Sequence, residues 1–426
     1  MFDRDRWQEI FNAIKKNKLR SILTAFGVFW AIFMLVVMTG AGNGLKNGVY
    51  EGVKDFATNS GFMWAQNTTK AYEGYKRGRN WHITNKDIDA IKDQVDGIEV
   101  ISPRLEGWTL RGGENVVRGK RSAAFGVMGD YPTYREIDPC TMVWGRYIND
   151  EDIRLKRKVC IIGEKVYEVM FDKDEDPVGQ YMRVNGVYFM VAGVFRSNNP
   201  QINIGGNKKE TIYLPFTAMQ QTFNFGDQVH YYAFVAKDGL LVSDLMDQMK
   251  PILQKKHKLA PDDDEAFGQF DLANQIKMMA YIFLGINILI WVVGIGTLIA
   301  GAVGISNIML VIVKERTKEI GIQRAIGARP WVVISQILTE SVFLTTLAGF
   351  IGLAFGTFIL FLTDAAIDAS RANLVTEEET FFLNPGVGLP LALSALSMLI
   401  LVGLIAGLVP AMKAVRIKPI EALRHE

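Results

Sequence analysis

The sequence is poor in the residues that build metal and redox sites. It has two cysteines and four histidines among 426 residues. The histidines show no metal-site spacing, and none lies in an HExxH motif: His82, His230, His257 and His425. Cys140 and Cys160 both fall in a segment that is assigned below to the outside of a membrane, where disulfides persist if the compartment is oxidising. A bridge between them and a pair of buried free thiols are both open.

Motifs for nucleotide and calcium binding are also missing. The stretch GGENVVRGKRS comes nearest to a phosphate-binding loop, but GxxxxGK[ST] requires glycine at Glu114 and serine or threonine at Arg121. The run DKDED at 172–176 begins like a calcium loop, but neither the required glycine nor the closing glutamate follows in place. No nucleophile–base pattern is evident. We therefore expect no enzyme activity in this chain, and neither a metal nor a cofactor.

Long apolar runs, in contrast, are abundant. Four windows carry almost no charge: 21–44, 278–313, 341–363 and 380–412. Each exceeds the roughly 20 residues that cross about 30 Å of hydrocarbon at 1.5 Å per residue. The pattern predicts an α-helical membrane protein with four transmembrane helices. It also predicts a large extracytoplasmic mixed α+β domain, inserted between spans one and two.

Basic residues are concentrated in three segments. Residues 1–20 hold six basic and three acidic residues, 314–329 five and two, and 413–426 four and two. The positive-inside rule places these segments, and so both termini, in the cytoplasm. Residues 45–277, with 31 basic and 32 acidic residues, then lie outside. A nucleic-acid-binding domain usually has a strongly basic face, which this near-zero charge balance does not indicate. We therefore expect no nucleic-acid partner.

These patterns divide the chain into segments. The second span is charge-free for 36 residues, about 54 Å of helix, so we expect it to continue beyond the bilayer as a stalk. The predicted segments are a cytoplasmic amphipathic helix at the lipid interface (1–20), an uncleaved first span (21–44), the external domain (45–277), a second span with its stalk (278–313), a cytoplasmic coupling helix (314–330), a third span (331–363), a short external loop (364–385), a fourth span (386–412) and a cytoplasmic tail (413–426).

Within the external domain, local patterns predict several elements. Asn185–Gly186 lies between two β-rich runs and tolerates the positive φ angles of a type I′ turn, which indicates a hairpin over 181–194. Residues 159–162 are typical of a strand and 164–171 of a short helix. The apolar spacing over 238–256 predicts a further helix.

Small and polar residues in the later spans suggest packing roles. Glu340 lies at the cytoplasmic end of span three, where a boundary or helix-packing role fits better than a proton relay. Pro410 is expected to end or kink span four. Two GxxxG pairs would allow close helix contact: Gly352 with Gly356, and Gly403 with Gly407.

The segment VIVKERTKEIGIQRAIGAR, residues 311–329, is a densely charged block between two spans. Its apolar and charged residues alternate as in an amphipathic helix. A short charged helix at this position is suited to docking a soluble partner. A solvated loop whose charges only set the membrane topology is the alternative.

Four stretches resemble ABC-transporter permeases of the MacB/FtsX-like type. GISNIMLVIVKERTKEIGIQRAIGAR (304–329) is similar to their second span and cytoplasmic loop. NKLRSILTAFGV near the start resembles their first span, DPVGQYMRVNGVYFMVAGVF (176–195) the hairpin of their periplasmic domain, and GLVPAMKAVRIKPIEALR (407–424) their closing motif. The resemblance runs in order along nearly the whole chain and is weakest in the external domain.

The resemblance implies a mechanism and a set of partners. Such permeases form dimers, here a homodimer or a pair with a closely related permease, in the bacterial inner membrane with cytoplasmic ATPase subunits that bind ATP and magnesium. ATPase closure is thought to move the first two helices and the periplasmic domain. The chain begins at its interfacial helix, so a separate ATPase is expected. The residues implied in ATPase coupling are Glu315, Arg316, Lys318, Glu319, Gly321, Arg324 and Gly327.

Two functional hypotheses follow. The first is a permease that drives export or extrusion of an unidentified substrate, with a periplasmic adaptor and an outer-membrane exit duct as open partners. The second is an FtsX-like regulator of a periplasmic hydrolase, or a lipoprotein-release permease. A membrane-anchored external enzyme or sensor is disfavoured, because it gives the 314–329 block no role.

Overall fold

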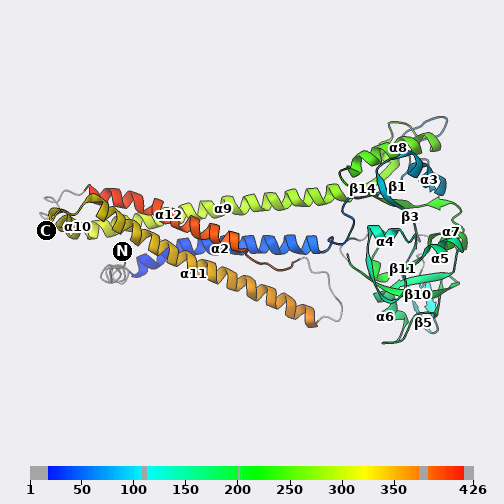
Figure 1. Ribbon diagram of the computed structural model, residues 1–426, viewed down its shortest axis with the longest axis horizontal. Coiled ribbons are helices and arrows are strands. Elements are labelled where there is room, and N and C mark those ends of the chain that lie inside the picture. Colours follow the sequence, from blue (N-terminus) through cyan, green and yellow to red (C-terminus); the bar gives the residue numbers. More distant parts are fainter. Residues whose placement is uncertain (1–17, 108–112, 200–201, 203, 374–381, 417–426) are drawn as a thin grey trace. The chain divides into compact units, whose positions relative to one another are not determined.

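The computed structural model describes residues 18–107, 113–199, 202, 204–373 and 382–416 (Figure 1). The chain forms two compact units. We call Met1–Gly48 with Tyr281–Glu426 the helical unit, and Val49–Ala280 the inserted domain. Residues 1–17 of the predicted interfacial helix and 417–426 of the predicted tail lie outside the described residues.

Among the described residues, four helices are long and apolar enough to cross a membrane, which confirms the predicted architecture. They are α2 (Lys18–Glu51), α9 (Leu272–Glu315), α11 (Pro330–Asn373) and α12 (Leu389–Val415). A short helix, α10 (Thr317–Ala325), lies between α9 and α11 in the chain. The protein is therefore a multi-pass membrane protein with a large domain between its first and second spans.

The helices differ in extent from the predicted spans. Helix α9 has 44 residues, about 66 Å, and begins before position 278. Helix α11 continues past position 363 to Asn373, because the alanine-rich run that follows has high helix propensity. Helix α12 passes through Pro410 and ends at Val415. Of the two effects expected of this proline, an end or a kink, the end is wrong.

Helix α2 supplies much of the core of the helical unit. Val28, Ala31, Ile32, Leu35 and Val36 are all buried, and their spacing places them on one helical face. Helix α9, in contrast, leaves many large apolar side chains exposed. Apolar residues all round a helix are typical of a span that faces lipid or another span.

The inserted domain is built on one mixed sheet. Its described strands are β1 (Ser60–Ala65), β3 (Ile98–Glu106), β4 (Val116–Arg118), β5 (Arg121–Ala123), β6 (Gly126–Asp130), β7 (Cys140–Gly145), β8 (Val159–Gly163), β9 (Tyr181–Val184), β10 (Val187–Ser197), β11 (Thr211–Pro215), β13 (Tyr231–Ala236) and β14 (Phe267–Asp271). Their order is β14-β1-β13-β3-β6-β11-β8-β10-β9-β4-β5, and β7 pairs with β10. Two short strands, β2 (Ile83–Thr84) and β12 (Gln228–Val229), form a separate pair.

The sheet has two halves that meet at the end of β3. Strands β14, β1, β13 and β3 are antiparallel neighbours, and β3 reaches β6 through only two residue pairs, Leu105 with Gly129 and Glu106 with Met128. The second half contains two parallel pairs, β6 with β11 and β8 with β10. The end of β3 is therefore where side chains from both halves converge.

Short helices cover the two halves. Helices α3 (Asn85–Gln94) and α8 (Val242–His257) pack on the first half, and α6 (Glu164–Met170) and α7 (Phe216–Thr222) on the second. The other helices that the structure describes in this domain are α4 (Tyr134–Ile137) and α5 (Asp150–Arg154), with 3₁₀ turns η2 (Lys208–Glu210) and η3 (Asp264–Ala266). The predicted helix over 164–171 and the one over 238–256 are confirmed as α6 and α8.

The predicted hairpin is also confirmed. Strands β9 and β10 pair antiparallel from Val184 and Val187, and the two turn residues, Asn185 and Gly186, have φ angles of 45° and 84°. Positive φ at both positions is what a type I′ turn requires.

Both cysteines are free thiols. Cys140 lies on β7 and Cys160 on β8, which pair with opposite edges of β10. Two strand spacings of about 4.8 Å separate such strands, more than the roughly 7 Å that a disulfide spans between Cα atoms. Of the two alternatives left open by the sequence, the structure has the pair of thiols.

Candidate functional site

The helix predicted to couple to an ATPase, 314–330, begins at a tight joint between α9 and α10. Arg316 is the residue between the two helices, with φ −93° and ψ 12°. Its N–H donates to the carbonyl of Ile312 at 2.9 Å, and its own carbonyl accepts from the N–H of Ile320 at 3.0 Å. Backbone hydrogen bonding thus continues through the bend, so α10 is a short, stiff extension of α9.

An ion pair ties this joint to α11. Arg316 Nη1 lies 2.8 Å from Glu340 Oε1, and the Glu340 side chain is 7 % exposed. Glu319 lies near the same guanidinium, at 3.6 Å from Arg316 Nε. Arg316 therefore points at a membrane helix, α11. Glu340 has a helix-packing role, which the sequence favoured.

Arg324 makes a second tie, to α12. Its Nη1 donates to the carbonyl oxygen of Val415, the last residue of that helix. The last carbonyls of a helix lack intrahelical partners, and a cationic donor is suited to them. Like Arg316, Arg324 turns inward and holds α10 to another helix.

Gly327 ends α10 in a left-handed conformation. Its φ is +102°, its N–H donates to the Arg324 carbonyl at 3.1 Å, and the Ala328 N–H donates to the Gln323 carbonyl at 3.0 Å. These bonds are the two of a Schellman cap, which requires the positive φ that glycine adopts without strain. Gly321, in contrast, is buried within α10.

The remaining predicted coupling residues lie on an exposed surface. Glu315, Lys318 and Glu319 are exposed. Two apolar side chains beside them are also exposed to solvent: Ile326 is 81 % exposed and Ile322 is 43 % exposed. We call these five residues the coupling face. It combines charge with exposed apolar area, as docking surfaces do.

The predicted packing glycines lie at helix contacts. A Cβ on Gly352 would stand 2.6 Å from the Phe29 carbonyl oxygen of α2, and one on Gly356 would stand 2.9 Å from Val36. Gly403 and Gly407 face α11, where a Cβ would stand 2.9 Å from Val342 Cα and from Ser341 Cβ. A further close approach, which the sequence analysis did not predict, brings Gly27 of α2 to Gly301 of α9.

The inserted domain contains a buried charged centre where the sheet halves meet. Arg104 of β3 forms a bidentate ion pair with Asp130 of β6, and both side chains are buried. The guanidinium stacks 3.6 Å from the ring centroid of Tyr134, and its Nη1 donates to the Tyr231 hydroxyl at 2.8 Å. Burial raises the pKa of Tyr231. These residues are far apart in the sequence and form no local motif, so the sequence analysis did not predict this cluster.

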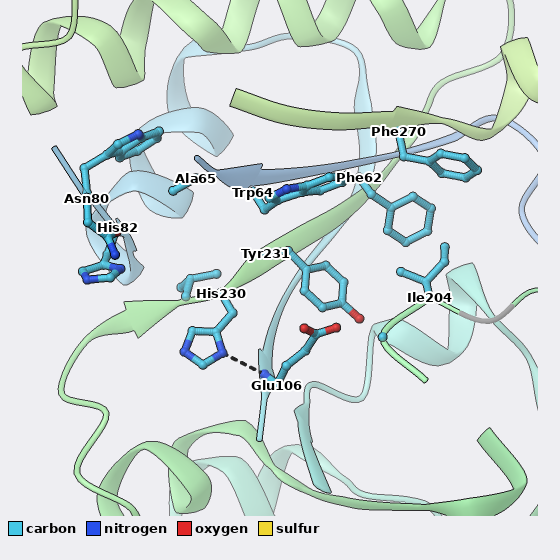
Figure 2. Close-up of a pocket in the computed structure, with 13 residues that line it drawn as sticks. Phe62, Trp64, Ala65, Asn80, His82, Glu106, Ile204, His230, Tyr231 and Phe270 are labelled. Atoms are coloured by element: carbon cyan, nitrogen blue, oxygen red, sulfur yellow. Dashed lines mark hydrogen bonds between the residues drawn. The ribbon is translucent and has the colours of Figure 1, made fainter. Parts of the chain in front are cut away.

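A cavity opens beside this centre (Figure 2). It measures about 740 Å³ and lies wholly within the inserted domain. Strands β1, β3, β13 and β14 contribute to its walls. Its described lining residues are Phe62, Trp64, Ala65, Asn80, Trp81, His82, Glu106, Ile204, Gly205, Val229, His230, Tyr231 and Phe270. The sequence analysis did not predict it, because the lining comes from several separated segments.

Within the part of the chain that the structure describes, neither the histidines nor the acidic run 172–176 has metal-site geometry. Among the described residues, no group of three or more His, Cys, Asp or Glu side chains is arranged to hold a metal ion. In the run 172–176, Asp172 is paired with Arg121 and Glu175 with Arg118.

Comparison with known families identifies the two units. A family model described as the MacB-like periplasmic core domain matches residues 21–252. A second, described as the FtsX-like permease C-terminal region, matches residues 279–419. The chain belongs to the MacB-like family of ABC-transporter permeases. The first match covers most of α2 and of the inserted domain, and the second covers the later helices.

Individual relatives agree along nearly the whole chain. The Macrolide export ATP-binding/permease protein MacB of Bdellovibrio bacteriovorus is 28 % identical over 98 % of this chain and 61 % of that protein. The Pyoverdine export ATP-binding/permease protein PvdT of Pseudomonas entomophila is 27 % identical over 96 % of this chain and 58 % of that protein. The chain thus spans about three-fifths of the length of these curated relatives. The solved periplasmic region of MacB from Actinobacillus actinomycetemcomitans aligns with 55 % of this MacB-like chain and 97 % of its own, at 15 % identity and a TM-score of 0.42.

Proposed function

We propose that this MacB-like chain is the permease subunit of an ABC exporter, and that α10 is where a cytoplasmic ATPase acts on it. One observation carries this proposal: α10 is held to three membrane helices at once. It continues α9 through Arg316, it is tied to α11 by Glu340, and it is tied to α12 by Arg324. A displacement of α10 would therefore be passed to all three helices.

The energy source lies outside these 426 residues. The sequence has no phosphate-binding loop, and both relatives bear names that include an ATP-binding part. We assign ATP and magnesium to a cytoplasmic ABC ATPase, which would dock on the coupling face. Glu315, Lys318 and Glu319 would make its polar contacts, and Ile322 and Ile326 would fill an apolar pocket of the partner.

Helix α9 gives the motion a route to the inserted domain. It is one helix from Glu315 back to Leu272, and Leu272 is buried among Phe56 and Phe62 of that domain. A helix transmits an axial push or tilt better than a flexible linker does. The proposed result is export or extrusion of a substrate, whose identity the sequence leaves open.

The orientation in this proposal follows the charges. The basic segments 314–329 and 413–426 would lie in the cytoplasm and the inserted domain in the periplasm, with the protein in the bacterial inner membrane. The exposed stripe Ile288, Val292, Ile295 and Ile299 of α9 would face a second copy of the chain. Gly296, beside this stripe, has open space that another helix could enter.

Cysteine cross-linking tests the dimer. Val292→Cys should form cross-linked dimers in membranes, because the paired α9 helices would bring these residues together. Phe358→Cys, exposed on α11, is the matched control and should not. Equal cross-linking at both positions, or none at Val292→Cys, would contradict this dimer.

Loss of the apolar contact tests ATPase docking. Ile326→Asp should abolish co-purification of the ATPase and the ATPase activity that the permease stimulates, while the melting temperature stays unchanged. Val143→Asp, on an exposed apolar residue of the inserted domain, is the control and should retain both. If the Ile326→Asp variant still bound the ATPase fully, the proposal that the ATPase docks on the coupling face would be contradicted.

A further inference from the structure

The cavity of the inserted domain has the size of a small-molecule site and an apolar wall that a ligand can reach. At about 740 Å³ it falls in the range of roughly 300–1,000 Å³ that is usual for ligand pockets. Phe62 and Tyr231 are buried at its base, whereas Trp64, Ile204 and Phe270 are only half-buried. A ligand can therefore contact the last three side chains, which Figure 2 shows around the cavity.

The Trp64 ring is positioned by a glycine on the neighbouring strand. Trp64 of β1 pairs with Gly268 of β14, and a Cβ on Gly268 would collide with the indole ring. The ring thus lies across β14 at this glycine, in place before a ligand arrives, which lowers the entropy cost of binding. Within the part of the chain that the structure describes, no acceptor is bonded to the Trp64 indole N–H. This donor is therefore available at the cavity wall, although an indole N–H that is removed from water usually has a partner.

The lining favours an uncharged ligand. Among the described residues that line the cavity there is no lysine, arginine or aspartate, and the Glu106 carboxylate lies against Gly205 and already has an interaction partner. His230 accepts the Glu106 backbone N–H at its Nδ1, at 3.0 Å (Figure 2). Burial lowers the pKa of His230, so this ring is neutral at pH 7. An ion that entered the cavity would lose hydration without gaining a free counter-charge.

We propose that this cavity binds an uncharged ring compound that carries a carbonyl or ether oxygen. Its rings would pack against Trp64, Ile204 and Phe270, and its oxygen would accept a hydrogen bond from the Trp64 indole N–H. Recognition then combines apolar contact with one directed hydrogen bond, a combination that is usual in small-molecule sites. The inference concerns the inserted domain alone and holds whether or not α10 binds an ATPase.

Photolabelling with benzophenone tests the proposal. Benzophenone is uncharged, has two rings and one carbonyl oxygen, and inserts into nearby C–H bonds when it is irradiated. The full chain, in nanodiscs of zwitterionic lipid, is irradiated at rising probe concentration, and mass spectrometry locates the adducts. Labelling of peptides that contain Trp64 or Phe270 should saturate, whereas labelling of the exposed apolar residues of α9 should rise in proportion to the probe dissolved in lipid. The anion 4-benzoylbenzoate and the cation (4-benzoylbenzyl)trimethylammonium should label the cavity peptides about tenfold less, because each would be desolvated there without compensation.

Two variants with matched controls locate the binding in the cavity, and the melting temperature of each checks its folding. Trp64→Phe keeps a ring but removes the N–H, and should raise the concentration for half-maximal labelling by about three- to tenfold, the scale of one neutral hydrogen bond. Trp144→Phe, on β7, should leave it unchanged.

Ile204→Trp adds volume at the cavity wall and should abolish the saturable labelling. Ala71→Trp, at an exposed position of the same domain, should retain it. The proposal is overturned if the cavity peptides show no saturable labelling, or if either charged probe labels them as well as benzophenone does. It is also overturned if the labelling is unchanged in folded Trp64→Phe and Ile204→Trp.

Discussion

Asp87, on α3, shows how single residues stabilise the inserted domain. Its carboxylate is buried, yet it lies 2.8 Å from His257 Nε2 and 2.7 Å from Lys256 Nζ, and it accepts from Thr84. Burial alone would raise its pKa, but the hydrogen bonds from His257, Lys256 and Thr84 outweigh burial, and the net pKa lies well below its usual range. The contact joins α3 to α8.

The pH dependence of the melting temperature tests whether the Asp87 carboxylate stabilises the folded chain. Because the folded pKa is depressed, the carboxylate adds stability that is fully present above the unfolded pKa of about 3.9 and is lost as the pH falls towards the folded value. We expect the melting temperature of the chain to fall more steeply between pH 5 and pH 3 than that of Asp87→Asn. Asp89→Asn, exposed on the same helix, should behave as the original chain does. Parallel curves for all three would contradict this role.

Arg316 and Arg324 show what residue patterns leave undecided. Both lie in the charged amphipathic block 311–329. From that position we predicted that they contact a partner, as we did for Lys318 and Glu319. In the structure both arginines contact membrane helices: Arg316 pairs with the buried Glu340, and Arg324 donates to the Val415 carbonyl at the end of α12. Charge-assisted hydrogen bonds to these acceptors are stronger than hydrogen bonds to water. Their acceptors, Glu340 on α11 and the Val415 carbonyl at the end of α12, are distant in the sequence. The local residue pattern around the arginines therefore could not predict these contacts.

At the level of elements, glycines set how closely the helices approach. Gly403 of α12 lies against Val342 and Thr345 of α11, and its carbonyl accepts from the Ser341 hydroxyl at 2.8 Å. Both features need the two backbones close together. The observed approach of α11 and α12 therefore requires a residue without a side chain at this position.

A bulky residue at this contact should separate the helices. Gly403→Val places a side chain within 2.9 Å of Val342 Cα, so we expect a loss of about 1–3 kcal/mol in the free energy of unfolding. Gly285→Val is the matched control, since nothing lies within 4 Å of its Cβ position on α9. Differential scanning fluorimetry in detergent measures both. A control that loses as much as Gly403→Val would show that the contact is unimportant.

For the whole molecule, long-range and short-range features were predictable to different degrees. The four spans, the inserted α+β domain and the hairpin at Asn185–Gly186 follow from hydrophobic length, charge asymmetry and turn chemistry, which are local properties. The strand order, the Arg104–Asp130 pair and the cavity at Glu106 come from segments distant in the chain. Side-chain convergence of that kind has no periodicity that a single sequence displays.

The central claim is that α10 passes the ATPase motion to the membrane helices through Arg316 and Glu340. The most direct test is a charge exchange, measured as permease-stimulated ATPase activity of the purified complex. Arg316→Glu and Glu340→Arg should each lose most of the stimulation while the ATPase still co-purifies. The double variant, Arg316→Glu with Glu340→Arg, should recover much of it, since the ion pair is restored in reverse. Unchanged stimulation in the single variants, or no recovery in a double variant that folds as stably as they do, would contradict the account.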